Sequence, residues 1–157
     1  MEFWLPADDL PVAELDQACA ERYLGDAPRT ALTTRRLRGL LMGFADLVFE
    51  ADGRWWVLDY KSNALGADDA AYDADALRGA VARHRYDVQL LIYQLALHRL
   101  LRARLGSAYD PARHLGGGID LFLRGSHGPV GGCFTLPADV ALLQRFDALL
   151  GSAGGTP

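Results

Sequence analysis

The sequence has 157 residues, the length of one domain, and a chain of this length can bury roughly 70% of its unfolded surface without disulfides or a structural metal. No run approaches the ~20 apolar residues of a membrane span and no signal peptide opens the sequence, so we expect a cytoplasmic protein with no membrane partner. The net charge of −4 argues against an unaided binder of duplex DNA, which usually has a basic face, but not against an enzyme to which a partner delivers the strand.

The N-terminal part predicts a strand, a helix and a connector. Glu2–Leu5 alternates briefly before a proline, which is typical of a short edge strand. Val12–Leu24 repeats apolar residues at helical spacing and is followed by a glycine, which favours a helix that ends there. Asp26–Arg36, with a proline and several threonines, is expected to connect this helix to the next strand.

A β-hairpin is the clearest feature of the central part. Leu37–Glu50 and Arg54–Lys61 are apolar segments typical of strands, and Asp52-Gly53 between them is the strongest short-range signal for a two-residue hairpin turn. A four-residue turn, which would offset the pairing of the two strands, remains an alternative.

After the hairpin we expect a loop (Ala64–Tyr72) and two helices (Ala74–His84 and Tyr86–Leu105). A strand (Gly116–Arg124), a turn region (Gly125–Gly132), a short strand (Cys133–Leu136) and a final helix (Pro137–Leu150) should follow. These elements indicate an α/β fold in which a mixed central sheet is flanked by helices. We expect a single domain over residues 1–150 and a disordered tail over residues 151–157.

The predicted hairpin brings two carboxylates together. With a two-residue turn, Asp46 lies directly opposite Asp59, and alternation places Asp59 and Lys61 on one face of their strand. Two carboxylates about 5 Å apart repel by roughly 3 kcal/mol at an effective dielectric near 20, whereas a good cross-strand pair returns only about 0.2–1 kcal/mol. A hard divalent cation would offset the repulsion, and Mg²⁺, for which Mn²⁺ can substitute, suits a site with two carboxylates.

Lys61 is the one lysine among the 16 basic residues, since all the others are arginine. In such a sequence a single lysine indicates a need for a compact ammonium, which can orient an attacking water or stabilise charge on a phosphate. The alternative is a solvated hairpin face on which Lys61 forms an ion pair with Asp59.

The segments around these residues resemble the nuclease-domain signature of the RecB-like family, within the PD-(D/E)xK superfamily. The resemblance extends from about Met1 to Leu150 and rests on an ordered series of segments: Gly43–Phe49 (GFADLVF), Leu58–Asn63 (LDYKSN), Leu65-Gly66, Ala71-Tyr72, His84–Gln89 (HRYDVQ), Tyr93–Arg99 (YQLALHR) and Leu121–Gly125 (LFLRG). It implies a restriction-endonuclease-like core and an Mg²⁺-dependent exodeoxyribonuclease that acts in double-strand-break repair and recombination.

The resemblance also implies roles for residues of the hairpin. Asp46 and Asp59 match the family's metal ligands, the main-chain carbonyl of Tyr60 matches a further ligand, and Lys61 matches the catalytic lysine.

Two residues of the second predicted helix match a further element of the family. Gln89 and Tyr93 correspond to its Gln-x-x-x-Tyr motif; four residues apart on a helix they share one face, beside the site, where they would contact DNA or orient Lys61. The alternative is the polar edge of a packed helix. Nearby arginines could form a basic patch for phosphates or an ordinary solvated face: Arg83, Arg85, Arg99, Arg102 and Arg104.

One feature of the family is missing from the sequence. RecB-like nucleases supply another metal ligand, a histidine on a helix before these strands, whereas the first histidine here is His84, after the hairpin. The resemblance therefore implies an N-terminally truncated core: the C-terminal piece of a helicase–nuclease with DNA and RecC-like and RecD-like subunits as partners, or a truncated reading frame. We expect the isolated chain to cleave DNA weakly or not at all.

Two other functions remain open. A catalytically inactive module with this fold could bind DNA and other proteins; the negative charge and the missing histidine favour it, and the presence of Asp46, Asp59 and Lys61 opposes it. A stand-alone metal-dependent phosphohydrolase acting on small substrates has no motif of its own in the sequence.

Overall fold

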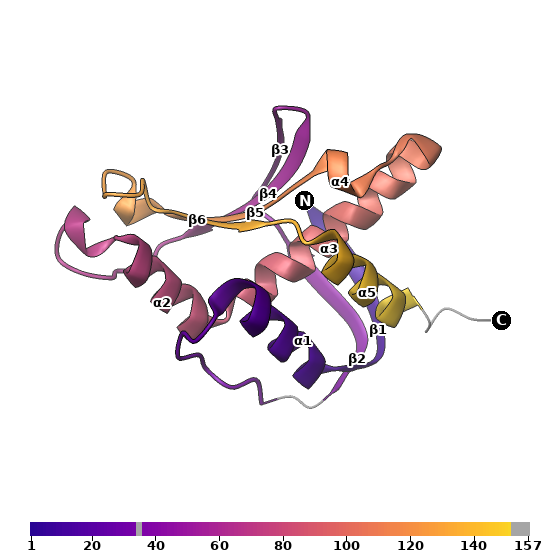
Figure 1. Ribbon diagram of the computed structural model, residues 1–157, viewed down its shortest axis with the longest axis horizontal. Helices are drawn as coiled ribbons and strands as arrows, with labels where there is room; N and C mark the ends of the chain where they lie inside the picture. Colours follow the sequence, from indigo (N-terminus) through magenta and orange to yellow (C-terminus); the bar gives the residue numbers. More distant parts are fainter. Residues whose placement is uncertain (34–35, 152–157) are drawn as a thin grey trace.

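The computed structural model describes residues 1–33 and 36–151 as an α/β fold with two sheets (Figure 1). The strands are β1 (Glu2–Pro11) and β2 (Arg36–Phe44), which pair with each other, and β3 (Leu47–Ala51), β4 (Arg54–Lys61), β5 (Leu115–Phe122) and β6 (Cys133–Pro137), which form a second sheet in that order. Because β4 and β5 run parallel while the other pairs are antiparallel, the prediction of a mixed central sheet is confirmed.

Helices cover this sheet and fill the space between it and the β1–β2 pair. They are α1 (Val12–Cys19), continued by a π-helical turn (Ala20–Leu24), α2 (Ala74–His84), α3 (Tyr86–Leu105), α4 (Pro111–His114) and α5 (Val140–Gly151), with short 3-10 turns at Asp69–Ala71, Gly106–Ala108 and Leu123–Gly125. α2 and α3 have the bounds that the sequence predicts. Figure 1 shows α1, α2 and α5 below the four-stranded sheet. No helix of the described residues is long and apolar enough to cross a membrane.

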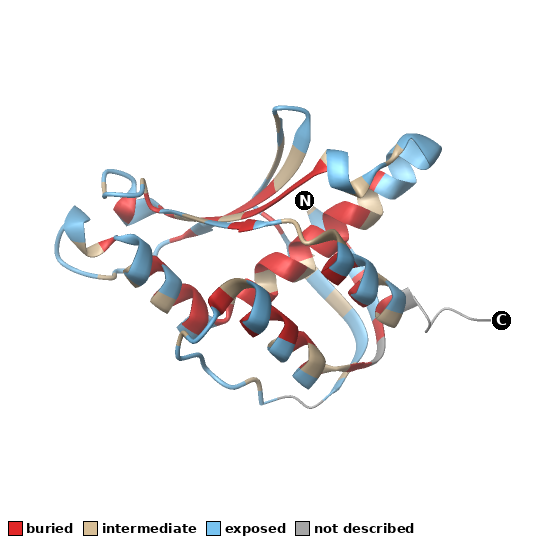
Figure 2. Cartoon of the chain, in the orientation of Figure 1, coloured by how far each residue is buried: buried red, intermediate tan, exposed pale blue. Residues whose placement is uncertain are grey.

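α3 is the central element of the core. It packs against β4 and β5 and also contacts β1, α1, α2 and α5, and it is buried along much of its length (Figure 2). Gly118 of β5 permits this close approach, because a Cβ there would lie 3.1 Å from the side chain of Leu90 and 3.2 Å from that of Gln94. The first turns of α3 are thereby held beside the end of β4.

The β3–β4 hairpin has the predicted two-residue turn. Ala51 pairs with Arg54, and the backbone φ angles of Asp52 and Gly53 are 52° and 74°, as a type I′ turn requires. The four-residue alternative is therefore excluded.

The prediction of one strand over Leu37–Glu50 is wrong, because this segment forms two strands in two different sheets. β2 ends at Phe44 and β3 begins at Leu47. At the break, Ala45 N donates to Met1 O (2.9 Å) and the N-terminal amine donates to Ala45 O (2.5 Å), so the chain stays tied to the start of β1 while it changes sheets. Asp46 therefore lies at the junction of the two sheets, not within a strand.

Several element ends also differ from the predictions. β1 continues past Pro6. A proline is tolerated there because β1 pairs with β2 along one edge only, and no strand on its other edge needs the N–H that proline lacks. The last helix starts later than predicted: Pro137 ends β6, and Asp139 accepts from Leu142 N (2.9 Å) as the cap of α5.

Parts of two predicted segments lie outside the described residues. These are residues 34 and 35 of the predicted connector and residues 152–157 of the predicted tail, whose first residue, Gly151, ends α5.

The junction between α2 and α3 depends on Arg85. This residue has a left-handed backbone (φ 58°), and its buried guanidinium forms two hydrogen bonds of 3.1 Å with the buried carboxylate of Asp87 and another with Asp16. Paired charges in a core position hold their groups firmly when every donor and acceptor is used. Arg85 thus sets the start of α3 and ties it to α1.

We expect Arg85→Leu to lower the free energy of unfolding by about 3 kcal/mol, because it leaves the carboxylate of Asp87 buried without its partner. Urea denaturation measures the change. Arg78→Leu, at an exposed position of α2, is the matched control and should change stability by no more than about 0.5 kcal/mol. Equal losses of unfolding free energy in the two variants would contradict the role of the Arg85–Asp87 pair in stabilising this junction.

Candidate active site

The ammonium of Lys61 lies at the end of β4 among several acceptors. Nζ donates to Asp59 Oδ2 (2.5 Å) and to Gln89 Oε1 (2.6 Å), and it lies 3.3 Å from Asp120 Oδ1. It is also 3.6 Å from the centroid of the Tyr86 ring, within cation–π range. With the residue only 5% exposed, these contacts fix the ammonium in one place.

The surroundings of Lys61 keep it charged. Burial disfavours the ammonium, but the carboxylates of Asp120 and Asp59 outweigh burial, so the pKa of Lys61 lies above its usual value. Lys61 is therefore a fixed cation at neutral pH, suited to orienting or stabilising an anion and not to abstracting a proton.

Asp46 reaches this site from the junction between the sheets. β3 begins at Leu47, opposite Leu58, so the last residues of β4 have no partner in β3. The N–H of Tyr60 donates instead to Asp46 Oδ2 (2.8 Å). The β3–β4 register pairs Leu47 with Leu58, which carries Asp46 to the level of Asp59. The sequence predicts this placement from the turn.

The two carboxylates have the chemistry of a divalent metal site. Asp46 Oδ2 and Asp59 Oδ2 are occupied by hydrogen bonds, whereas no described residue bonds to Oδ1 of either one. No group of three or more His, Cys, Asp or Glu residues that could hold a metal is found within residues 1–33 and 36–151, so the described residues offer a two-carboxylate set. Such a set fits Mg²⁺, which keeps several of its own waters.

Gln89 and Tyr93 share one face of α3, as predicted, and form a hydrogen-bonded chain with Lys61. The amide of Gln89 accepts from Lys61 through Oε1 and donates from Nε2 to the Tyr93 hydroxyl (2.7 Å). The Tyr93 ring packs edge-on against Phe3, with 5.4 Å between centroids. Burial raises the pKa of Tyr93, so its hydroxyl remains a neutral donor. Gln89 and Tyr93 therefore lie beside Lys61 on a packed face of α3, with the amide of Gln89 bonded to the ammonium.

Sequence reasoning missed Asp120. This residue of β5 pairs across the parallel ladder with Asp59, and its side chain is fully buried. Neither carboxylate oxygen has a hydrogen bond among the described residues, although Lys61 Nζ is near. Burial raises the pKa of Asp120 to about 7 against the opposing effect of Lys61. An aspartate between Ile119 and Leu121 in an otherwise apolar strand was the available signal.

The five arginines suggested as a phosphate patch do not form one. Arg85 is buried in its pairs with Asp87 and Asp16, and Arg99 and Arg102 both bind Asp147 at distances of 2.5 Å. Arg83 is exposed in the last turn of α2, whereas Arg102 and Arg104 lie in the last turn of α3, the far end of the next helix.

The comparisons with known proteins agree with this geometry. A family model described as "PD-(D/E)XK nuclease superfamily" matches residues 12–116, well over half of the chain. Fold and sequence together define the class, and the chain belongs to the PD-(D/E)XK nuclease superfamily.

Its relatives include RecB subunits of the RecBCD enzyme. The chain is 42% identical to that of Escherichia coli over 95% of its own length, 41% identical to that of Haemophilus influenzae over 78%, and 39% identical to that of Mycobacterium tuberculosis over 93%. It spans 13%, 10% and 13% of these relatives, respectively, and matches their C-terminal region.

Proposed function

We propose that this chain is the nuclease domain of a RecBCD-type helicase–nuclease, with residues 1–150 as a single domain that hydrolyses DNA phosphodiester bonds during double-strand-break repair and has RecC-like and RecD-like subunits as partners. The observation that carries the proposal is the placement of the single lysine: Lys61 is buried, charged and bonded to Asp59, with Asp46 at the same level. Such an arrangement stabilises charge on a phosphate undergoing attack.

The contacts of these residues and the family resemblance together suggest the part of each one. Asp46 and Asp59 would hold Mg²⁺ through their Oδ1 atoms, and the resemblance adds the carbonyl of Tyr60 as a further ligand. The bound ion would polarise the phosphate and make water a better nucleophile. Lys61 orients the attacking water and stabilises the negative charge that develops. Gln89 holds the ammonium toward that point, and Tyr93 offers its hydroxyl to the DNA.

A hybrid enzyme tests this function directly. The matching C-terminal region of the Escherichia coli RecB subunit is replaced by this chain, and the assembled RecBCD enzyme is assayed for release of nucleotides from DNA ends. We expect cleavage that requires Mg²⁺ or Mn²⁺ and stops with a chelator. A hybrid that still unwinds DNA but never cuts it would contradict the proposal.

An inactive binding module is the second candidate, favoured by the net charge of −4 and by the missing histidine ligand, since the first histidine, His84, follows the hairpin. It predicts that the hybrid enzyme binds and unwinds DNA without cutting it and that Asp59 variants behave like the unaltered hybrid. The same assay therefore separates the two functions.

Asp120→Asn is expected to slow cleavage by the hybrid enzyme about tenfold while metal affinity changes little. The substitution preserves volume but removes one of the charges that hold the ammonium of Lys61, and small displacements of catalytic groups can cost up to about 10²-fold in rate. The rate at saturating DNA and the Mn²⁺ affinity are the measurements. An unchanged rate would show that Asp59 and Gln89 position Lys61 without Asp120.

A further inference from the structure

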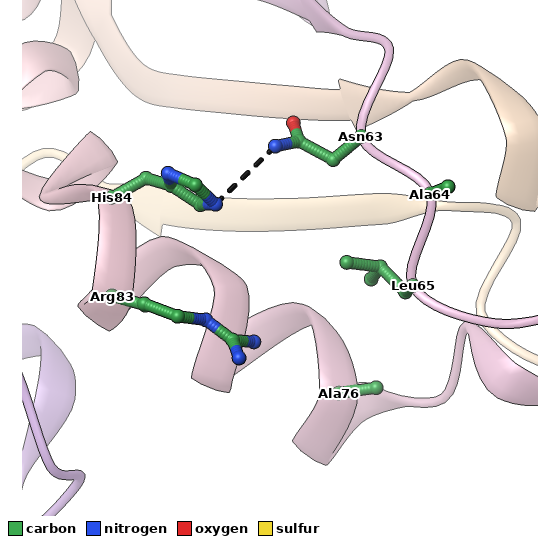
Figure 3. Close-up of a pocket in the computed structure, with 6 residues that line it drawn as sticks. All are labelled: Asn63, Ala64, Leu65, Ala76, Arg83 and His84. Atoms are coloured by element: carbon green, nitrogen blue, oxygen red, sulfur yellow. Dashed lines mark hydrogen bonds between the residues drawn. The ribbon is translucent and has the colours of Figure 1, made fainter.

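A polar pocket lies beside the candidate active site, between the end of β4 and α2. It has a volume of about 330 Å³ and is lined by Asn63, Ala64, Leu65, Ala76, Arg83 and His84. Figure 3 shows Arg83 and His84 extending from α2 toward the chain that carries Asn63, with Leu65 pointing toward them. We call it the Arg83–His84 pocket.

Arg83 gives the pocket a positive charge that none of its described lining residues offsets. The Arg83 side chain makes no hydrogen bond or ion pair with any residue in the described part of the chain, unlike Arg85, Arg99 and Arg102. None of the described lining residues is acidic. An exposed guanidinium aimed into a hollow without a counter-charge favours an anionic ligand with planar or tetrahedral oxygens.

The amide of Asn63 is oriented to donate into the same space. Its Oδ1 accepts from the Tyr86 hydroxyl (3.2 Å), which turns Nδ2 toward His84 Nε2 at 3.4 Å (Figure 3). That contact is long, so the N–H groups of Nδ2 can be shared with a ligand. Arg83 and Asn63 thus supply donors from opposite walls.

The pocket is joined to the active site through one side chain. The Tyr86 ring stacks on His84 with 5.2 Å between centroids and lies 3.6 Å from Lys61 Nζ. Asn63 follows Lys61 by two residues, a span of at most about 7 Å in an extended chain. The pocket therefore lies close to Lys61, where a subsite for a neighbouring phosphate would have to be.

We propose that the Arg83–His84 pocket binds a phosphate of the DNA strand next to the phosphate held at Lys61. This inference rests on the proposed function and adds a substrate-binding subsite to it. Arg83 and Asn63 bind the phosphate oxygens, and the apolar side chain of Leu65 faces the adjoining sugar. The subsite fixes the position of the strand relative to Lys61 without reading its sequence.

Binding of a fluorescein-labelled single-stranded oligonucleotide to this chain, in a chelating buffer that prevents cleavage, tests the subsite. Arg83→Gln should weaken binding about tenfold, the size expected when one charged hydrogen bond is lost. It should also reduce the slope of log K against log salt by about 0.7, the value for one phosphate contact on a single strand. Arg78→Gln, on the same helix but outside the pocket, is the control and should change neither quantity by as much.

Each other result has a definite meaning. Equal effects of Arg83→Gln and Arg78→Gln, or no effect of either one, would overturn the subsite and leave the proposed function standing. Failure of the unaltered chain to bind the strand would overturn the subsite, whereas the proposed function is judged separately by cleavage in the hybrid enzyme. Saturable binding of inorganic phosphate that depends on Arg83, without any effect of Arg83→Gln on the strand, would instead assign the pocket to free phosphate.

Discussion

The Lys61→Ala hybrid enzyme is expected to lose DNA cleavage by about 10³-fold, the loss seen when a group that stabilises developing charge is removed. Metal binding should be retained, because the Oδ1 atoms of Asp46 and Asp59 remain in place. Cleavage rate and Mn²⁺ titration are measured on the same preparation, and DNA unwinding shows that the enzyme has assembled.

Lys61→Arg is the informative companion to this variant. Arginine keeps the charge, but its planar guanidinium cannot fit among Asp59, Gln89 and Tyr86 as the compact ammonium does. We expect it to fail as well. Cleavage by Lys61→Ala at the unaltered rate would remove Lys61 from the mechanism and favour the binding module.

Asp59→Asn is expected to abolish both cleavage and metal binding. The amide has the same size, but it offers a neutral oxygen in place of the carboxylate. In a two-carboxylate set, Asp46 is then the one remaining charged ligand. Asp52→Asn is a matched control, since it removes one negative charge in the β3–β4 turn, where asparagine also adopts the left-handed backbone.

Calorimetric titration of the isolated variants distinguishes the loss of a metal ligand from the loss of a negative charge elsewhere on the hairpin. Asp59→Asn should show no heat of Mn²⁺ binding, whereas Asp52→Asn should bind as the unaltered chain does. Equal binding by all three proteins would mean that the carboxylates at this site do not hold the metal.

The sequence predicted the hairpin because its signal is local. Asp52-Gly53 specifies a turn type, the turn specifies the register, and the register places Asp46 at the level of Asp59. α2 and α3 were likewise predicted because apolar spacing is a local pattern, and the structure shows that the cap of α2, Asp73, is local as well.

The features that sequence reasoning missed depend on contacts between distant segments. The break at Ala45 follows from hydrogen bonds with Met1, and the pairing of Asp59 with Asp120 follows from a parallel ladder between strands more than fifty residues apart. The grouping of Tyr86 with Lys61 required the start of α3 to be placed against the end of β4. No local pattern carries such information.

Isothermal titration of Mg²⁺ or Mn²⁺ into the isolated chain tests the central claim, that Asp46 and Asp59 form a metal site beside Lys61, most directly. We predict one ion bound with roughly millimolar affinity. Thermal stability should then rise by about 1.4 kcal/mol at ten times the dissociation constant, since the ion binds the folded state. No heat of binding and an unchanged melting temperature at saturating concentrations of either ion would contradict the claim.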